Sequence, residues 1–335
     1  MKSLIILIPA GQNNLSSVIG PYKFFLKANE YMEFTGREPV FKVQLAGVNK
    51  QLDLYDGVFS IRPHLHIKDV KKTDLLIIPA QAYSGLEHTI SINKQCIEFI
   101  KEQHHLGAEV ASICTGAFLL AATGLMEGKQ CSTHWKASSK FHRMFPEVIL
   151  QTDKILTDEG GIYTNGGAFS FLNLLLYLVE KYYGRETAIF CAKIFQVDMD
   201  RDSQSQFTIF NGQKDHTDDI VMKAQEMIEK NIMERFSMDQ LADILALSRR
   251  NFDRRFFRAT GNTPLEYQQR VKIETAKKLL ESGHKTVSEV MYEVGYLDVK
   301  AFRELFRKLT GLTPLDYRKR YNKDAELISA DTTPD

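Results

Sequence analysis

The spacing of hydrophobic residues changes about two thirds of the way along the chain. Before residue 200, short apolar runs rich in β-branched residues recur between stretches with helical spacing, at residues 4–8, 40–46, 75–78 and 109–113. Near-continuous apolar strands that alternate with helices are typical of a parallel sheet covered on both faces. The first two hundred residues therefore predict an α/β doubly wound domain built on a parallel sheet.

After residue 220 the apolar positions follow helical spacing throughout, and one segment is used twice. Residues 251–270 reappear fifty positions later as residues 301–320. The matched pairs are Phe252 and Phe302, Phe256 and Phe306, Gly261 and Gly311, Pro264 and Pro314, Tyr267 and Tyr317, and Arg270 and Arg320. Each copy follows a short helical stretch and a turn, which is the order of a helix-turn-helix unit. The sequence thus predicts an all-α domain that contains two such units.

The second helix of each copy combines an apolar stripe with a polar face. Phe252 faces inward with the phenylalanine one turn later, and Ser248 stands where it can cap this helix. Asp298 has the capping place in the second copy, after a turn at Gly295 that favours positive φ. A long helix over residues 264–282 is predicted to join the two units, and the two Gly-x-Thr-Pro sequences are read as helix ends and starts.

The net charge of +1 hides an uneven distribution of charge. Residues 235–322 hold 18 Lys and Arg against 11 Asp and Glu, whereas the rest of the chain holds 25 against 31. A basic face on one amphipathic helix is often only a solvated surface, but basic faces on two duplicated units favour contact with phosphates. Double-stranded DNA is therefore the predicted partner. The side chains predicted to contact it are Ser248, Arg249, Arg250, Arg254, Arg255, Lys300, Arg303 and Arg307.

The length of 335 residues suits two domains with separate cores. We predict a first domain over residues 1–200, a polar linker over residues 201–219, a DNA-binding domain over residues 220–322 and a flexible tail over residues 323–335. These boundaries rest on composition, because the run between the two domains is rich in Asp, Ser, Gln and Gly.

Neither a membrane segment nor a metal site is predicted. The apolar run at residues 4–8 is too short for a secretory signal, and the apolar helix predicted at residues 169–179 is too short to cross a membrane. The four cysteines form no Cys-x-x-Cys pair, which indicates neither a zinc site nor a disulfide framework. We therefore expect a cytoplasmic protein without metal, cofactor or membrane contact.

Cys114 lies where the predicted strand at residues 109–113 passes into a predicted helix at residues 115–123. A side chain at such a turn projects above the sheet, and the helix N-terminus is expected to lower the pKa of the thiol. His134 follows as a candidate base, and the glycine-rich turn at residues 165–167 is expected to close the rim of the same crevice. Ligands of open α/β sheets bind at these carboxyl ends of strands.

These motifs resemble two known families. Residues 235–321 are similar to the DNA-binding domain of AraC/XylS transcription regulators, through the sequence at residues 247–252 and the paired Gly-x-Thr-Pro exits. The elbow Cys-Thr-Gly-Ala-Phe, the Thr-His-Trp at residues 133–135 and the Thr-Asn-Gly-Gly at residues 164–167 resemble the class I glutamine-amidotransferase-like superfamily with its PfpI-like proteases. Their order resembles the amidotransferase-like, GlxA-type branch of the AraC/XylS family.

The resemblance implies a flavodoxin-like first domain that senses a small molecule and dimerises. It also implies a sequence-specific transcription regulator that acts as a homodimer, contacts RNA polymerase and responds to a small nitrogenous metabolite, such as an amino acid or a betaine-like amine. The residues expected to bind this effector are Gly11, Cys114, Thr115, His134, Trp135, Asn165 and Gly166.

Three roles of Cys114 remain open: it lines an effector pocket, it is a buried structural thiol, or it is a nucleophile. In the enzymes of this superfamily a carboxylate near the first strand often supports the cysteine, but the loop over residues 11–17 has no acidic residue. We therefore expect a regulator rather than an enzyme, with Cys114 and His134 as vestigial catalytic candidates. The alternatives are a cysteine-dependent amidase, deglycase or protease that carries a DNA-binding module, and a constitutive regulator whose first domain binds nothing.

Overall fold

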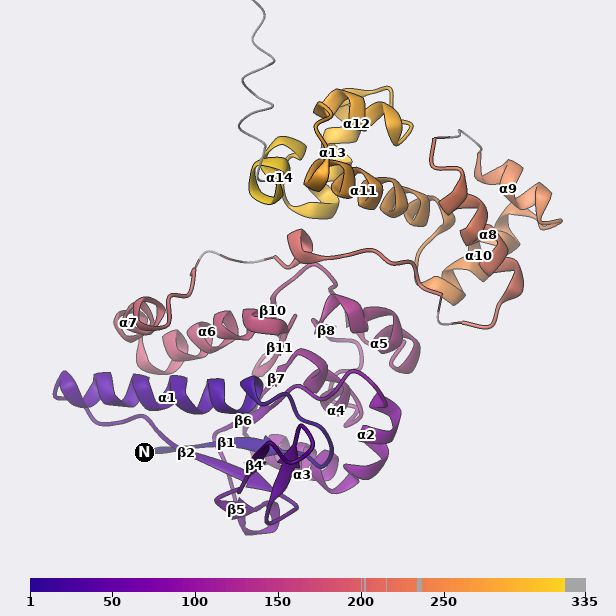
Figure 1. The fold of residues 1–335 in the computed structure, drawn as a ribbon. Coiled ribbons are helices and arrows are strands. Elements are labelled where there is room, and N and C mark those ends of the chain that lie inside the picture. The colour runs from indigo at the N-terminus through magenta and orange to yellow at the C-terminus, as the bar shows by residue number, and fades with distance from the viewer. Residues whose placement is uncertain (200, 202, 215, 234–236, 323–335) are drawn as a thin grey trace, which may run out of the picture. The chain divides into compact units, whose positions relative to one another are not determined.

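The computed structural model describes residues 1–199, 201, 203–214, 216–233 and 237–322 (Figure 1). The described chain forms two compact units that divide between Gln204 and Ser205. The domain limits inferred from composition stay predictions, and the predicted tail at residues 323–335 lies outside the described residues.

The first unit is built on a seven-stranded sheet with the order β10-β11-β7-β6-β1-β2-β5. Its strands are β1 (Lys2–Ile8), β2 (Phe41–Gly47), β5 (Leu65–His66), β6 (Leu75–Ile78), β7 (Glu109–Ile113), β10 (Leu156–Asp158) and β11 (Ile162–Asn165). All neighbouring strands are parallel except β10 and β11, which pair antiparallel at one edge. Two small ribbons lie outside this sheet, β3 (Leu52–Leu54) with β4 (Phe59–Ile61) and β8 (Gln130–Cys131) with β9 (Ile149–Leu150). The predicted parallel sheet is confirmed, with one antiparallel edge strand added.

Helices cover both faces of the sheet (Figure 1). One face carries α1 (Ser16–Phe34), α6 (Phe171–Tyr183) and α7 (Arg185–Phe195), and the other carries α2 (Leu86–Ile92), α3 (Lys94–His105), α4 (Ala117–Ala121) and α5 (Ser138–Met144). Successive residues of β1 supply the two cores in turn, because a strand points its side chains to opposite faces. Leu4 and Ile6 pack under α1, whereas Ile5 and Leu7 pack under α3 and α4. The doubly wound architecture is therefore confirmed.

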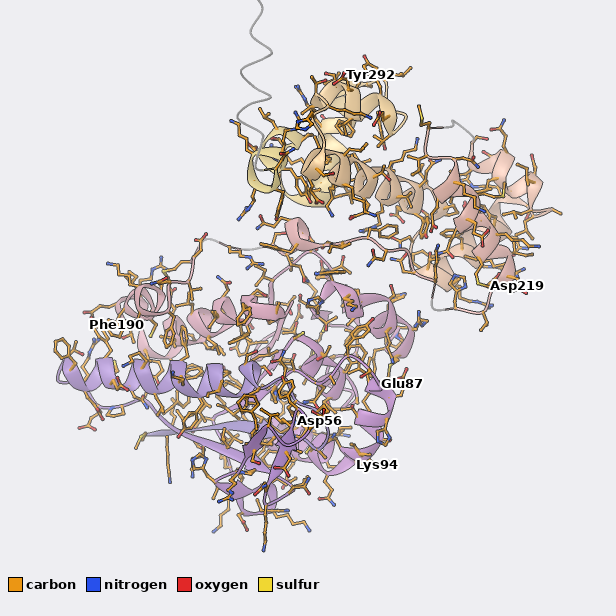
Figure 2. All side chains as sticks on the ribbon, viewed as in Figure 1. Asp56, Glu87, Lys94, Phe190, Asp219 and Tyr292 are labelled. Carbon is orange, nitrogen blue, oxygen red and sulfur yellow. The ribbon has the colours of Figure 1, made fainter. Side chains whose placement is uncertain are left out.

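Two predicted helices have different bounds in the structure. The helix expected at residues 169–179 begins at Phe171, because Phe169 lies in a 3-10 turn and is 72% exposed. The helix expected from Thr115 starts instead as a 3-10 turn, Cys114–Gly116, and α4 ends at Ala121. On the same unit, Phe190 of α7, labelled in Figure 2, stacks on Tyr31 of α1 with 4.2 Å between ring centroids.

The second unit is wholly helical in its described part. It contains α8 (Asp219–Lys230), α9 (Met238–Ile244), α10 (Arg249–Thr260), α11 (Pro264–Ser282), α12 (Val287–Glu293), α13 (Val299–Thr310) and α14 (Pro314–Tyr321). Its apolar residues form two separate cores, one around Phe252 and Phe256 and one around Phe302 and Phe306. Each core belongs to one helix-turn-helix pair, α9 with α10 and α12 with α13, and α11 contributes to both. The two predicted units and their connecting helix are confirmed.

The signals for helix ends and starts work in both copies. Gly261 and Gly311 end α10 and α13 in the left-handed conformation, with φ of 72° and 74°. Gly295 has φ of 75° in the turn before α13, as predicted. Asp298 caps α13 by accepting the backbone amides of its first turn. Ser248 has the extended backbone of an N-cap residue, but its hydroxyl makes no capping hydrogen bond, so that part of the prediction was wrong.

Candidate functional site

Cys114 forms a sharp elbow at the end of β7. Its φ is 57°, a left-handed value that is costly for any residue with a side chain. Gly116 and Gly167 allow other segments of the chain to pack closely against this elbow. A β-carbon at Gly116 would lie 2.7 Å from the carbonyl oxygens of Ile78 and Pro79, and one at Gly167 would lie 2.4 Å from the Cys114 sulfur. The predicted glycine-rich turn therefore closes over the thiol, and Gly167 is the residue that touches it.

The Cys114 thiol lies in surroundings that disfavour the thiolate. Burial raises the pKa of the Cys114 thiol above 9.0, and the nearby backbone amides of Ala168 and Thr115 oppose this shift only in part. Backbone amides at this turn lower the pKa of the thiol as expected, but burial, which the sequence did not indicate, outweighs them and makes the net shift upward. Since the thiolate is the nucleophilic form, this burial does not activate the Cys114 thiol.

His134 is engaged by the backbone rather than by the thiol. Its Nδ1 accepts the backbone amide of Lys136 at 3.1 Å, which places the hydrogen of the neutral ring on Nε2. Burial, followed by the charge of Lys136, lowers the pKa of His134 below 6.5. Within the described residues no hydrogen bond joins His134 to the Cys114 sulfur. The ring instead packs near Trp135, with 5.1 Å between centroids.

Thr133 and Gln204 connect the elbow to the end of the first unit. The Thr133 hydroxyl donates to the Cys114 carbonyl oxygen at 2.9 Å, and the Gln204 amide donates to the Thr133 carbonyl oxygen at 3.1 Å. A β-carbon at Gly166 would lie 2.7 Å from this Gln204 amide. Sequence reasoning missed Gln204, because a polar residue 90 positions after the elbow carries no local signal.

The side chains expected to bind an effector divide into two groups. The Thr115 hydroxyl donates to the Gln81 carbonyl oxygen at 2.6 Å, and the Asn165 amide donates to the Ile155 and Ser170 carbonyl oxygens at 2.9 and 3.1 Å. Thr115 and Asn165 are 3% and 0% exposed, so their polar groups hold the loops together. The residues with partly open surface are Gly11, Cys114, His134 and Trp135.

The loop after β1 has an amide network and no acidic residue at positions 11–17. Asn13 donates to the Pro9 carbonyl oxygen at 2.8 Å and accepts the Gln81 side-chain amide at 2.7 Å. No carboxylate of the described residues is bonded to the Cys114 thiol. Two cavities of the first unit, of about 540 and 330 Å³, are lined by residues that were not predicted to bind an effector.

In the second unit, α10 and α13 present the predicted DNA-binding residues. Ser248, Arg250, Arg254, Lys300, Arg303 and Arg307 are exposed. Arg249 is held by two carboxylates, Asp253 at 2.9 Å and Asp239 at 3.2 Å. Arg255 donates to Asp218 at 2.5 Å and is only half exposed. These two arginines are already paired with carboxylates within the protein. Asp218 precedes α8 and Asp239 lies on α9, so neither carboxylate is a sequence neighbour of its arginine.

The two exposed faces differ in chemistry at matched positions. Asp253 of α10 corresponds to Arg303 of α13, and Arg249 corresponds to Val299. Val299 is 42% exposed at the start of α13. Each face therefore carries an exposed apolar side chain beside its cationic ones, but at different places: Val299 at the start of α13, and Phe257, which is 46% exposed, in the second half of α10.

Comparison with known proteins covers both units. The model of a helix-turn-helix domain matches residues 241–320, and the model of the DJ-1/PfpI family matches residues 19–181. The HTH-type transcriptional regulator GbdR of Pseudomonas aeruginosa is 25% identical over 309 residues, which are 91% of this chain and 80% of that regulator. The chain is an AraC-type transcription regulator with a DJ-1/PfpI domain. The predicted family, fold class and general function are confirmed for this regulator.

Two further relatives concern the first unit of the regulator. A solved structure of a Vibrio parahaemolyticus protein, described as a transcriptional regulator, matches 58% of this chain and 98% of its own, with 26% identity and a TM-score of 0.52. An isonitrile hydratase of Pseudomonas putida is 29% identical over 130 residues, 38% of this chain and 54% of that enzyme. Similarity to regulators thus extends over more of the chain than similarity to an enzyme, which favours a regulator.

The described residues show neither a membrane helix nor a metal cluster. None of their helices combines the length and apolar character needed to cross a membrane. No three of their His, Cys, Asp and Glu side chains are grouped so that they could hold a metal ion. All four cysteines are free thiols.

Proposed function

We propose that this AraC-type regulator binds a small nitrogenous metabolite in the crevice above Cys114 and thereby changes how its two helix-turn-helix units bind DNA. We further propose that it acts as a homodimer in the cytoplasm and contacts RNA polymerase. The DNA-contacting side chains in this proposal are the exposed members of the predicted set, with Arg250 and Arg254 on α10 and Lys300, Arg303 and Arg307 on α13.

The observation that supports an effector site is an elbow whose cysteine is not paired with a base. Cys114 has a left-handed backbone and close glycine neighbours, burial raises the pKa of its thiol, and His134 is bonded to the backbone. Strained backbone persists only where the surroundings require it. His134 and Trp135 follow Thr133, which is bonded to the elbow, and both have partly open surface. The Trp135 face suits a cationic amine.

The test is thermal unfolding of the full-length chain in the presence of single amino acids, betaines and polyamines. A ligand at 100 times its Kd stabilises the native state by about 2.7 kcal/mol. We expect at least one amine to raise the unfolding temperature, and Trp135→Ala to abolish the increase. Phe34→Ala is the matched control, because Phe34 is an aromatic residue that is 87% exposed at the end of α1. If no amine stabilises the chain, or if Trp135→Ala responds like the unchanged chain, the effector proposal fails.

Similarity to an isonitrile hydratase favours a second candidate, hydrolysis or hydration at Cys114. Replacement of Cys114 with Ala separates the two. The regulator proposal expects DNA binding and its response to the amine to survive Cys114→Ala, with no turnover of isonitriles or amides by the unchanged chain. Turnover that disappears in Cys114→Ala would establish the enzyme.

A further inference from the structure

Residues 205–218, here named the strap, run along the second unit from α14 past α11 to α8 and α10 (Figure 1). Composition alone placed this segment in a polar linker. In the structure the segment makes hydrogen bonds with both helix-turn-helix halves. All of its residues except Asp215 are described. The strap is therefore a part of the DNA-binding unit.

The beginning of the strap lies on the second half. The guanidinium of Arg320 donates to the Gln206 side chain at 2.5 Å, and the Tyr321 hydroxyl donates to the Gln206 carbonyl oxygen at 3.3 Å. The 3-10 turn Ser205–Phe207 packs against α13, the helix with the second DNA-contacting face. The strap thus starts in contact with α13 and α14.

The middle of the strap completes a buried ion pair. Lys277 and Glu274 of α11 lie 2.7 Å apart, and their side chains are only 6% and 11% exposed. Lys277 donates to the Thr208 carbonyl oxygen at 2.6 Å, and the Phe210 amide donates to Glu274 at 3.0 Å. A buried pair is costly unless its remaining donors and acceptors are satisfied. The strap backbone supplies these partners.

The end of the strap reaches the first half. The Phe210 ring packs edge-on against Tyr267 with 5.1 Å between centroids, and a β-carbon at Gly212 would lie 2.5 Å from the Tyr267 hydroxyl. Asp218 then caps α8 by accepting the Val221 amide and accepts the Arg255 guanidinium at 2.5 Å. The strap therefore ends in an ion pair with α10, the helix with the first DNA-contacting face.

The two halves have separate cores, and α11 is the helix that both share. Of the described side chains outside α11, Ile232 packs against both cores. The strap adds a second connection, which touches α13 at one end and α10 at the other.

We propose that Glu274 and Lys277 are positioning residues for DNA recognition: by docking the strap they hold α10 and α13 in the one arrangement in which both engage the same duplex. This inference rests on the proposed function in one respect, that one chain uses both helices on DNA. The strap follows directly after Gln204, which is bonded to the Cys114 elbow through Thr133. A change at the elbow therefore reaches the docked segment through two hydrogen bonds and the peptide bond between Gln204 and Ser205.

The variant that tests the proposal is Glu274→Met combined with Lys277→Met in the full-length chain. Removal of both charges avoids an unpaired buried ion, and apolar replacements of similar size are well tolerated at such sites. The Thr208 carbonyl and the Phe210 amide then lose their partners, so the strap is expected to leave α11 for water. The matched control is Glu226→Met with Lys230→Met, which removes an exposed pair of the same charges from α8.

The first measurement is the distance between spin labels at Asp243→Cys on α9 and Tyr292→Cys on α12, both exposed positions. The labels are placed in a Cys114→Ala chain, because the other three cysteines are buried. We expect a narrow distance distribution in this parent and in the control variant, and a broad one in the Glu274/Lys277 variant. An equally narrow distribution in all three would overturn the proposal.

The second measurement is affinity for a duplex selected from a random-sequence library by the unchanged chain, compared with the same duplex scrambled in one half. Loss of simultaneous engagement lowers the affinity for the intact duplex at least about tenfold. The scrambled duplex is expected to bind the Glu274/Lys277 variant within about twofold of the unchanged chain. An equal loss on both duplexes, or no loss on either, contradicts the positioning role.

Failure of the proposed two-helix mode has a different signature. In that case the unchanged chain binds the intact duplex no more tightly than the duplex scrambled in one half. The label distances still report whether the strap holds the two helix-turn-helix halves in one arrangement. Circular dichroism melting of each variant confirms that the helices remain folded.

Discussion

A β-carbon at position 167 would lie 2.4 Å from the sulfur of Cys114, so only glycine fits at this position beside the thiol. The turn after β11 thereby covers the elbow after β7, and two segments fifty residues apart form one wall. This contact contributes to the burial that raises the pKa of the thiol.

Gly167→Ala is expected to destabilise the first unit by about 2 to 4 kcal/mol, since it adds a clash to an unfavourable backbone conformation. Gly184→Ala is the matched control. Gly184 has nearly the same φ, 89° against 88°, but nothing lies within 4 Å of its would-be β-carbon. We expect Gly184→Ala to destabilise the first unit by about 1 to 2 kcal/mol. Urea unfolding of both variants gives the difference, and equal losses would show that the contact with Cys114 is unimportant.

Stability is expected to fall at alkaline pH because the thiols are buried. Burial raises the pKa of Cys96, Cys131 and Cys191 from 9.0 to about 12, and raises that of Cys114. Between these values the folded chain keeps protons that the unfolded chain loses, so rising pH favours unfolding. The stability that the protonated thiols contribute is fully present below pH 9. Above pH 9 the free energy of unfolding declines by up to about 1.4 kcal/mol per pH unit for each thiol.

Urea unfolding at intervals from pH 7 to 10 measures this decline. Cys96→Ala should make the slope shallower, whereas its effect at pH 7 reports only lost packing. A free energy of unfolding that stays constant up to pH 10 would contradict the burial of the thiols.

Arg254 and Arg255 are neighbours with different expected roles. Arg254→Ala removes an exposed cation of α10 and is expected to weaken DNA binding by about 1 to 3 kcal/mol if it reads a base, or to lower the salt slope by about one if it holds a phosphate. Arg255→Ala breaks the ion pair with Asp218 and is expected to lower the stability of the second unit. Anisotropy titrations at several KCl concentrations, together with melting curves, distinguish the two. Reversed effects would mean that Arg255 leaves Asp218 to bind DNA.

Val299 is expected to contribute to sequence preference through apolar contact. An exposed valine at the start of a helix in the major groove suits the methyl group of thymine. Val299→Ala should reduce discrimination at one base pair by about 1 kcal/mol and leave the salt slope unchanged. Val58→Ala, at a 72% exposed position in the first unit, is the control. Unchanged selection of sequences by Val299→Ala would place this residue outside the groove.

The sequence predicts elements well where local signals mark them. The bounds of β6, β7 and α11 agree with the apolar runs and with Pro264 as the first residue of its helix. The duplication revealed both helix-turn-helix units, because its phenylalanines recur in register. The parallel pairing follows from the rule that parallel strands are joined by crossover helices, whereas the order of the strands was not predicted.

Features that depend on distant partners were not predictable. Asp218 neutralises Arg255 from 37 positions away, and the turn at Gly167 sets the burial of Cys114. The strap was not predicted, because its contacts with the Glu274–Lys277 pair use the backbone groups of Thr208 and Phe210. Backbone groups are the same in every residue, so polar composition indicated only a linker.

The docked strap also bears on how such regulators exchange their parts. The helix-turn-helix match begins at residue 241, but the contacts of the helical unit begin at Ser205. A gene fusion that joined a foreign sensor at residue 220 would leave Glu274 and Lys277 buried without the Phe210 amide and the Thr208 carbonyl. Recombination between regulators of this architecture should therefore be tolerated best at joints before Ser205, where the strap is inherited together with the helices it binds.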